Sequence, residues 1–281
     1  MSFLSIRGIV IRSVLHKESD RIIRILTREH GIVNAIVPGA DKSASRFAYS
    51  TKPLMLCDFV LAKSRDFYYL RESEIVEPFL QVQEDIEKLT ASAHMLEITS
   101  DVCVDHESSG EMYPLLLYAL YALAQKESDY RLIVSIFEWK VPDLLGFTAD
   151  LGGCSCGEAS SQYVFSFTSC RLFCMRQACL IKAGSYLYVS QGSVDALKYI
   201  YMAPLGKLFH FSVSVKVLDE ISKISRRYLC ERREKNYSRM ELLANVPVWN
   251  VAKPDVPVGN VDKPDVPVGS VDKPAEPDSG K

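Results

Sequence analysis

Hydrophobic and polar residues alternate along the first 80 residues of the chain, in short runs separated by turn residues. Alternation with a period of two is typical of β-strands, whose successive side chains point to opposite faces of a sheet. β-Branched and aromatic residues are enriched in these runs, as they are in strands. The pattern predicts strands over residues 5–15, 20–28, 32–37, 54–63 and 66–71. Five short strands suit a small β-barrel.

The connections between these predicted strands differ in length. Residues 29–31 form a short loop that contains a glycine, as a hairpin between the second and third strands requires. Residues 39–51 follow neither the helical nor the strand period. We therefore expect a long connection between the third and fourth strands, and this connection carries Lys42 and Arg46.

The period of the hydrophobic positions changes after the barrel. From residue 83 onward Ile86, Leu89 and Leu96 recur at the spacing of one helical face. Further helices are expected over residues 112–126, 130–145, 193–202 and 212–235. The fold class is therefore α+β, with a barrel over residues 1–80 and an all-helical domain over residues 81–245.

The last part of the chain repeats a ten-residue unit, VAKPDVPVGN, VDKPDVPVGS and VDKPAEPDSGK, beginning at Val251. Proline recurs in each unit, and valine is its main large apolar residue. Such a segment cannot bury enough apolar surface to offset the entropy of ordering, so we predict disorder over residues 246–281. A neutral repeat expansion is the favoured interpretation, and a spacer or a lure for partners is the alternative.

The charge of the chain is unevenly distributed. The formal net charge of −2 argues against nucleic-acid binding, but the predicted tail alone has four lysines against six acidic residues. Residues 1–80 carry 12 basic residues against nine acidic ones, and residues 221–239 carry seven against two. Local basic charge of this kind is typical of a surface that binds phosphates.

No apolar run approaches the roughly 20 residues that a membrane helix needs. Arg7 and Arg12 interrupt the apolar start of the chain, which therefore predicts a strand rather than a secretory signal. We expect a cytoplasmic protein, in which thiols stay reduced and clustered cysteines bind metal more often than they form disulfides.

Five cysteines fall within 26 residues of the chain, in a predicted zinc-finger-like insertion over residues 150–182. Zinc favours four soft ligands in a tetrahedron, which two close pairs around a hairpin can supply. Cys154 and Cys156 form the first pair, and the second is either Cys174 with Cys179 or Cys170 with Cys174. We prefer Cys154, Cys156, Cys174 and Cys179 as ligands of a structural zinc, with Cys170 as the alternative ligand. A relic of a metal site, with buried or free thiols, is the other interpretation.

Catalytic signatures are not found in the sequence. Residues 16–18 spell H-x-E, but the P-C-x-x-C of zinc deaminases does not follow. Neither H-E-x-x-H nor the phosphate-binding G-x-x-x-x-G-K-[ST] motif is present. We expect a protein that is not an enzyme; a zinc-dependent nucleic-acid-modifying enzyme and a protein-binding adaptor are the alternatives.

Four short motifs, taken in order, resemble the RecO family of recombination mediators over residues 1–245. They are ESDRIIRILTREHG from Glu18, GADKSASRF at residues 39–47, LLGFTADLGGCSCG from Leu144, and NYSR at residues 236–239 with Leu242. Each motif is degenerate, so their order and spacing carry the resemblance. The chain departs from the family in its cysteines: the first pair is one residue short, and Gln177 stands at the position of the fourth ligand.

The resemblance implies an OB-fold that binds single-stranded and double-stranded DNA and anneals complementary strands. It also implies that the protein acts with RecR to help RecA displace single-strand-binding protein, in association with the nucleoid. Neither a membrane nor a small-molecule substrate is implied.

An OB barrel binds a single strand with a cationic groove for the backbone and aromatic faces on which bases stack. The candidate DNA-binding residues are Lys42, Arg46, Arg21, Arg24, Arg28, Lys63, Arg65, Tyr68 and Arg239. Lys42 and Arg46 are preferred, because a loop has no structural need for basic residues. Alternatively, the arginines of residues 21–28 form a solvated face, and alternate rings of residues 67–69 fill the barrel. The basic residues from Arg226 to Arg239 either extend the DNA path or cover a helix.

Overall fold

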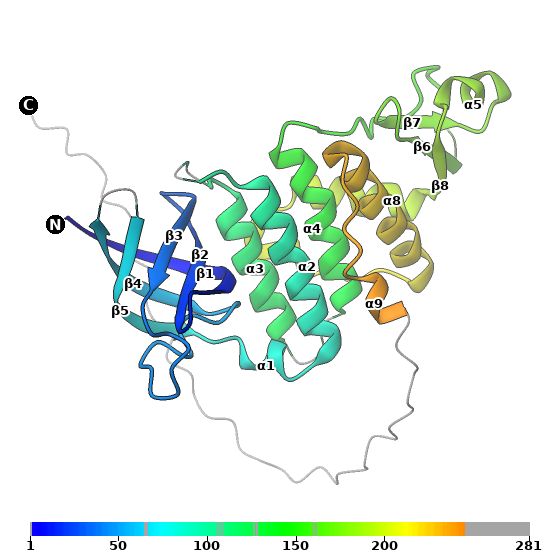
Figure 1. The fold of residues 1–281 in the computed structure, drawn as a ribbon. Helices are drawn as coiled ribbons and strands as arrows, with labels where there is room; N and C mark the ends of the chain where they lie inside the picture. Colours follow the sequence, from blue (N-terminus) through cyan, green and yellow to red (C-terminus); the bar gives the residue numbers. More distant parts are fainter. Residues whose placement is uncertain are drawn as a thin grey trace, which may run out of the picture. The chain divides into compact units, whose positions relative to one another are not determined.

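Five strands close into a barrel at the start of the chain (Figure 1). They are β1 (Phe3–His16), β2 (Asp20–Thr27), β3 (Ile32–Val37), β4 (Leu56–Ser64) and β5 (Phe67–Glu77). The order around the barrel is β1-β2-β3-β5-β4, in which β3 and β5 are parallel and the other pairs are antiparallel. This topology is that of an OB-fold, and it confirms the predicted five-stranded barrel.

The computed structural model describes residues 2–244, except residues 65, 66, 106, 108, 126, 128, 159 and 161. The predicted repeat tail over residues 246–281 and the candidate residue Arg65 therefore lie outside the described residues.

The long strand β1 takes part in both halves of the barrel. Residues 3–9 pair with β4, and residues 8–16 pair with β2. At the changeover, a Cβ on Gly8 would lie 2.4 Å from Ile25 Cγ2 and 2.7 Å from the carbonyl oxygen of Leu26. Only glycine fits there, and a bulge follows between Val10 and Arg12.

The barrel has its own core. Buried side chains inside it are Ile6, Val10, Ile23, Ile25, Val33, Ala35, Val37, Ala40, Phe47, Met55, Cys57, Phe59, Leu61 and Leu70. The opposite faces of β1 and β2 are also buried, because Ile9, Ile11 and Leu26 belong to the large core of the helices. The helices therefore cover part of the outer surface of the barrel.

After the barrel, the described residues include five longer helices: α2 (Ile86–Val102), α3 (Met112–Ala124), α4 (Tyr130–Leu144), α6 (Gln191–Met202) and α8 (Val215–Arg233). Four short helices accompany them, α1 (Leu80–Gln83), α5 (Gln177–Ala183), α7 (Leu205–Leu208) and α9 (Glu241–Ala244). Asp85, Asp129 and Ser214 each cap a helix by accepting a backbone N–H bond. Among the described helices, none is long and apolar enough to cross a membrane.

A small sheet is inserted between α4 and α6. Its strands are β6 (Gln162–Ser166), β7 (Arg171–Cys174) and β8 (Tyr186–Ser190), in the order β7-β6-β8. Cys154, Val164, Phe173, Cys174, Cys179 and Ala183 form its small core. The predicted α+β fold, a barrel followed by helices with a cysteine-rich insertion, is confirmed.

Candidate metal centre and nucleic-acid interface

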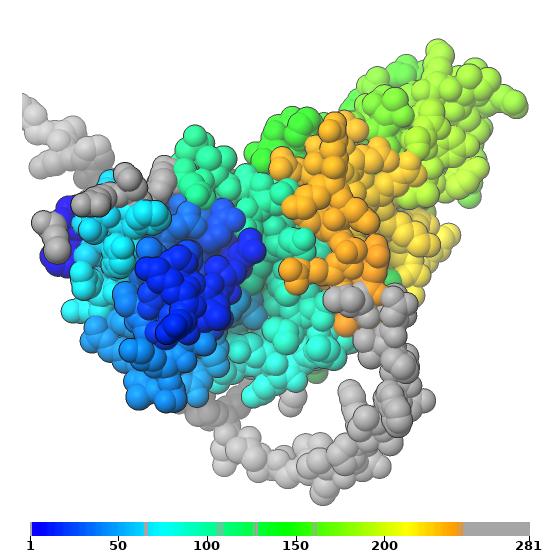
Figure 2. Space-filling model, viewed as in Figure 1, coloured from blue at the N-terminus to red at the C-terminus, as the bar shows by residue number. Residues whose placement is uncertain are grey.

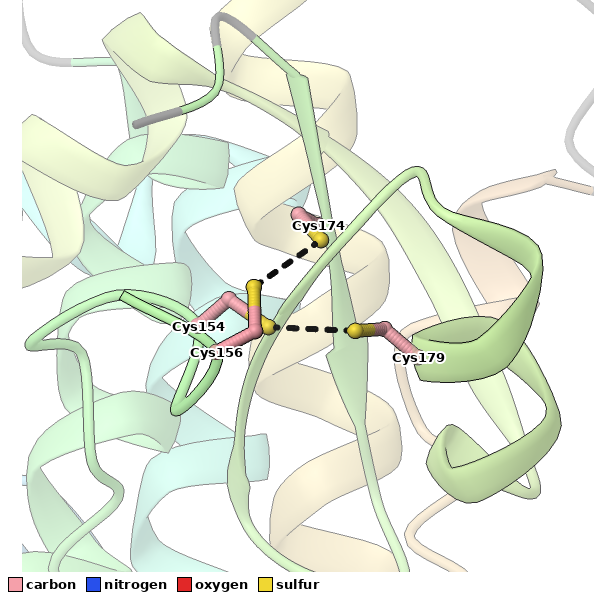
Figure 3. Close-up of side chains that lie close together, drawn as sticks. All are labelled: Cys154, Cys156, Cys174 and Cys179. Carbon is pink, nitrogen blue, oxygen red and sulfur yellow. Dashed lines mark hydrogen bonds between the residues drawn. The ribbon is translucent and has the colours of Figure 1, made fainter. Parts of the chain in front are cut away.

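Four cysteines of the insertion between α4 and α6 point toward one another (Figure 3). Their sulfur atoms all lie within 4.8 Å of each other, with 3.7 Å between Cys154 and Cys179 and 3.6 Å between Cys156 and Cys174. A tetrahedron with zinc–sulfur bonds of about 2.3 Å has sulfur–sulfur edges of about 3.8 Å, whereas a disulfide bond is about 2.05 Å long. The spacing therefore fits four thiolates around one metal ion.

The pKa values of these thiols are also consistent with the binding of a metal cation. Burial disfavours the Cys154 thiolate, but backbone N–H bonds from Cys156 and Cys174 outweigh burial and lower the pKa of Cys154 to about 6. The neighbouring thiol of Cys174 and burial raise the pKa of Cys179 to about 12. Four clustered thiols thus resist full deprotonation unless a positive ion compensates the charge. The cluster could hold a metal ion.

Local structure explains which cysteines meet. Cys154 and Cys156 lie on the loop after α4, where Gly153 has a φ of +116° that favours glycine. Cys174 ends β7, and Cys179 lies on α5, so the cysteine two residues after Gln177 completes the group. Cys170 is not in the group; its sulfur lies 3.7 Å from the carbonyl oxygen of Phe167.

The predicted loop cations lie on the connection between β3 and β4. Lys42 is exposed and has no ion pair with another described residue. Arg46 is also exposed, but its guanidinium donates to the carbonyl oxygen of Arg71 at 2.7 Å and lies over the ring of Phe47. Phe47 itself is buried in the barrel core. Of these two cations, Arg46 therefore contributes contacts to the fold, whereas the ammonium of Lys42 has no ion pair with a described residue.

Two of the three arginines over residues 21–28 lie on β2, and the third directly follows it. Arg21 forms an ion pair with Asp41 at 2.6 Å and donates to Ser13 at 3.0 Å. Arg24 donates to Ser100 on α2 at 2.8 Å and pairs with Asp105 at 3.1 Å. Arg28 follows β2 and is exposed. Arg21 and Arg24 thus have partners within the protein.

The aromatic side chains that could stack on bases differ in their exposure to solvent. Tyr68 packs partly against the barrel core, with the ammonium of Lys63 5.8 Å from its ring centroid. Phe67 and Tyr49 are more than half exposed, at 57% and 68%. Phe3, at 64%, is an exposed ring that sequence reasoning missed. Strand register places Phe3, Ala62 and Tyr69 in one row on the outer surface.

The basic residues of α8 and of the segment after it are largely paired within the protein. Arg226 pairs with the buried Glu138 at 2.6 Å, and Glu138 in turn pairs with His94. Arg233 and Lys235 both pair with Asp101, and the candidate Arg239 pairs with Glu97. These ion pairs connect α8 and the segment after it to α2 and α4.

The structure thus joins an OB-type barrel, a fold that binds oligonucleotides and oligosaccharides, to a helical body with an inserted four-cysteine cluster that could hold a metal. The family model of the Recombination protein O N terminal matches residues 1–79, and that of the Recombination protein O C terminal matches residues 83–240. The chain belongs to the RecO family, which acts in DNA repair and recombination.

Individual relatives agree with this assignment. The chain is 35% identical over 246 residues to the DNA repair protein RecO of Acetivibrio thermocellus, covering 86% of this chain and 97% of that protein. It is 26% identical over 245 residues to the DNA repair protein RecO of Clostridium perfringens, covering 86% and 98% respectively. The resemblance seen in the sequence motifs is therefore confirmed.

Proposed function

We propose that this protein binds single-stranded and double-stranded DNA and anneals complementary strands, without catalysing a reaction. In this proposal it acts with RecR to help load RecA onto DNA coated by single-strand-binding protein. The DNA-binding part of this proposal rests on Lys42, which lies on the connection after β3 of the OB barrel. Its side chain is exposed and has no ion pair with a described residue. An exposed cation that no acid neutralises is available to a phosphate.

Charge around the barrel supports the same interpretation. Lys42 and Lys52 are exposed near the mouth of a cavity formed with Arg21 and Asp41, about 370 Å³ in volume. The ammonium of Lys52 lies 4.5 Å from the ring centroid of the exposed Tyr49. Cations beside flat rings are the two elements with which OB barrels hold a single strand irrespective of its sequence. Binding that tolerates any sequence is what annealing requires.

We propose that the metal is zinc and that its role is structural. Four cysteines are a ligand set that zinc prefers, and a site closed by four protein ligands leaves no position for a reacting water. The small core around the cysteines has only six buried residues, although Phe165, Leu172 and Val189 of the same sheet also belong to the large core. Zinc bound by Cys154, Cys156, Cys174 and Cys179 would supply further stabilisation.

The test is annealing of complementary fluorescent oligonucleotides in the absence of added metal or nucleotide, together with binding measured by anisotropy over a range of salt concentrations. Lys42→Glu, alone and with Arg46→Glu, is expected to weaken binding and to lower the slope of log affinity against log salt by about one for each phosphate that the variant no longer neutralises. Lys207→Glu is the matched control, since Lys207 is an exposed lysine on α7. A wild-type protein that ignores oligonucleotides at low ionic strength would contradict the proposal.

A further inference from the structure

Two adjoining cavities run along the barrel where it meets the helices. One, of about 370 Å³, lies under the connection between β3 and β4. The other, of about 590 Å³, lies between β1 and β2 on one side and α2 with the segment after α8 on the other. Ser13 and Pro53 line both cavities, which therefore adjoin each other, and we call the two together the basic groove.

Figure 2 shows the elements around the larger cavity on one face of the molecule, with the barrel in blue, α2 in turquoise and the segment after α8 in orange. The residues that line the larger cavity come from all three of these parts of the chain.

The groove carries positive charge that its own acids do not neutralise. Its cationic residues are Arg12, Arg21, Arg24, Lys42, Lys52, Lys235 and Arg239, and its acidic residues are Asp41, Glu97 and Asp101. Each acid is already paired, Asp41 with Arg21, Glu97 with Arg239, and Asp101 with Lys235. Arg12, Lys42 and Lys52 have no ion pair with a described residue.

Arg12 is the most informative of these residues. It lies at the bulge of β1, where a change of register redirects side chains. Its side chain is exposed and forms no hydrogen bond or ion pair with another described residue. The guanidinium of Arg12 therefore remains available to a phosphate, which arginine can bind through two parallel hydrogen bonds.

The usual binding face of an OB barrel, the outer surface of strands two and three, is partly blocked in this protein. Leu26 and Ile32 on that surface are fully buried against the helices. Arg24 and Asn34 beside them are both bonded to Asp105. A strand of DNA cannot lie across this end of the face, whereas the basic groove at its edge stays open.

We propose that the backbone of a single DNA strand follows the basic groove from Lys42 and Lys52, past Arg12, toward the segment after α8. This inference rests on the proposed function and adds the path of the strand and two phosphate-binding residues, Arg12 and Lys52. The three unpaired cations supply a row of positions for phosphates, and the paired ones can exchange a carboxylate for a phosphate.

The experiment measures the anisotropy of a fluorescein-labelled oligothymidylate longer than the site of one OB barrel, at several salt concentrations, with the full chain. Arg12→Glu is expected to weaken binding and to lower the salt slope by about one. Arg12→Gln should show a smaller loss of affinity, and Arg12→Lys should retain most of it. Because the Arg12 side chain has no partner among the described residues, thermal unfolding should be unchanged in all three variants.

Lys207→Glu is again the control, because Lys207 borders neither cavity. If Arg12→Glu binds like the wild type, or if Lys207→Glu loses as much affinity as Arg12→Glu, the groove is not the path. If Lys42→Glu impairs binding while Arg12→Glu and Lys52→Glu do not, the groove is refuted and the proposed function stands. If the wild type fails to bind, the proposed function itself is refuted.

Discussion

Two sides of the same barrel carry opposite charge. The basic groove is lined by seven cationic and three acidic residues. The outer surface of β1, β4 and β5, which we call the acidic face, has a cavity of about 520 Å³ lined by Arg7 with Asp58, Glu72 and Glu74. Arg7 is held by two hydrogen bonds of 2.7 Å to Asp58, so the charges of Glu72 and Glu74 remain.

The acids on the two sides also differ in their partners. Asp101 in the groove accepts hydrogen bonds from Arg233, Lys235 and Tyr237 and so anchors the segment after α8. Glu72 and Glu74 on the acidic face have no ion pair with another described residue. The acids of the groove thus form ion pairs that stabilise the fold, and cations remain in excess there. The acids of the acidic face instead repel a phosphate backbone.

The largest effect is expected at the cysteine cluster, whose residues line neither side of this comparison. Cys174→Ser should abolish stoichiometric zinc and strongly destabilise the inserted sheet, since structural zinc contributes about 10 kcal/mol or more to the folding of small zinc modules. Metal analysis and thermal unfolding measure this. DNA binding should persist, because the cations of the groove are unchanged.

Cys170→Ser is the matched control for that variant, because Cys170 lies outside the cluster. It should keep its zinc. A Cys174→Ser protein that retains stoichiometric metal would refute the assignment of the ligands, and one that no longer binds DNA would show that the charge comparison omits a contribution of the inserted sheet.

A smaller effect is expected for Asp101→Asn in the groove. Burial raises the pKa of Asp101, but the hydrogen bonds from Lys235, Tyr237 and Arg233 outweigh it, so the pKa is lowered. The carboxylate is only about one-fifth exposed, at 22%. Removing its charged hydrogen bonds should lower the free energy of unfolding by about 2 kcal/mol at neutral pH, measured by urea denaturation.

The pH dependence of this difference gives a second check. A lowered pKa means that the carboxylate stabilises the fold above the ordinary pKa of aspartate, about 3.9, and that this stabilisation is lost as the pH falls through the lower value in the folded protein. The difference between wild type and Asp101→Asn should therefore shrink below about pH 4. A difference that is constant across this range would exclude the ionised carboxylate as its source.

The smallest effect is expected on the acidic face. Glu72→Gln with Glu74→Gln removes two charges that have no partner among the described residues, so the free energy of unfolding should change by less than about 0.5 kcal/mol. Oligonucleotide affinity should also stay close to that of the wild type. A large gain in affinity would show that DNA reaches this face and would remove the contrast between the two sides.

Much of the fold was predictable from local sequence. The alternation of residues 20–28 and 32–37 predicts β2 and β3 almost to the residue, because one face of each strand is buried in the barrel. The helical period after residue 83 predicts α2, and the apolar run from Met112 predicts α3. β5 is longer than predicted and reaches Glu77, because its end pairs with β4 although most of its residues are exposed and it does not alternate between polar and apolar residues.

The candidate site was predictable only in part. The sequence shows that five cysteines are close together in the chain, but the pairing of β6 with β7 and the position of α5 decide which four thiols meet. Arg12 was missed, since a single arginine on a strand carries no signal of the cavity beside it. The basic residues from Arg226 to Arg239 form ion pairs with Glu97, Asp101 and Glu138. These acids are distant in the sequence, so the sequence pattern did not predict the pairs.

The sequence by itself determined which segments are strands and helices, the class of the fold and the presence of a cysteine cluster. The tertiary structure decided which thiol completes the cluster, which cations are neutralised by ion pairs and which remain for a ligand. The physical reason is that secondary structure follows from the periodic burial of neighbouring residues, whereas the free charge of a side chain depends on acids that are distant in the sequence.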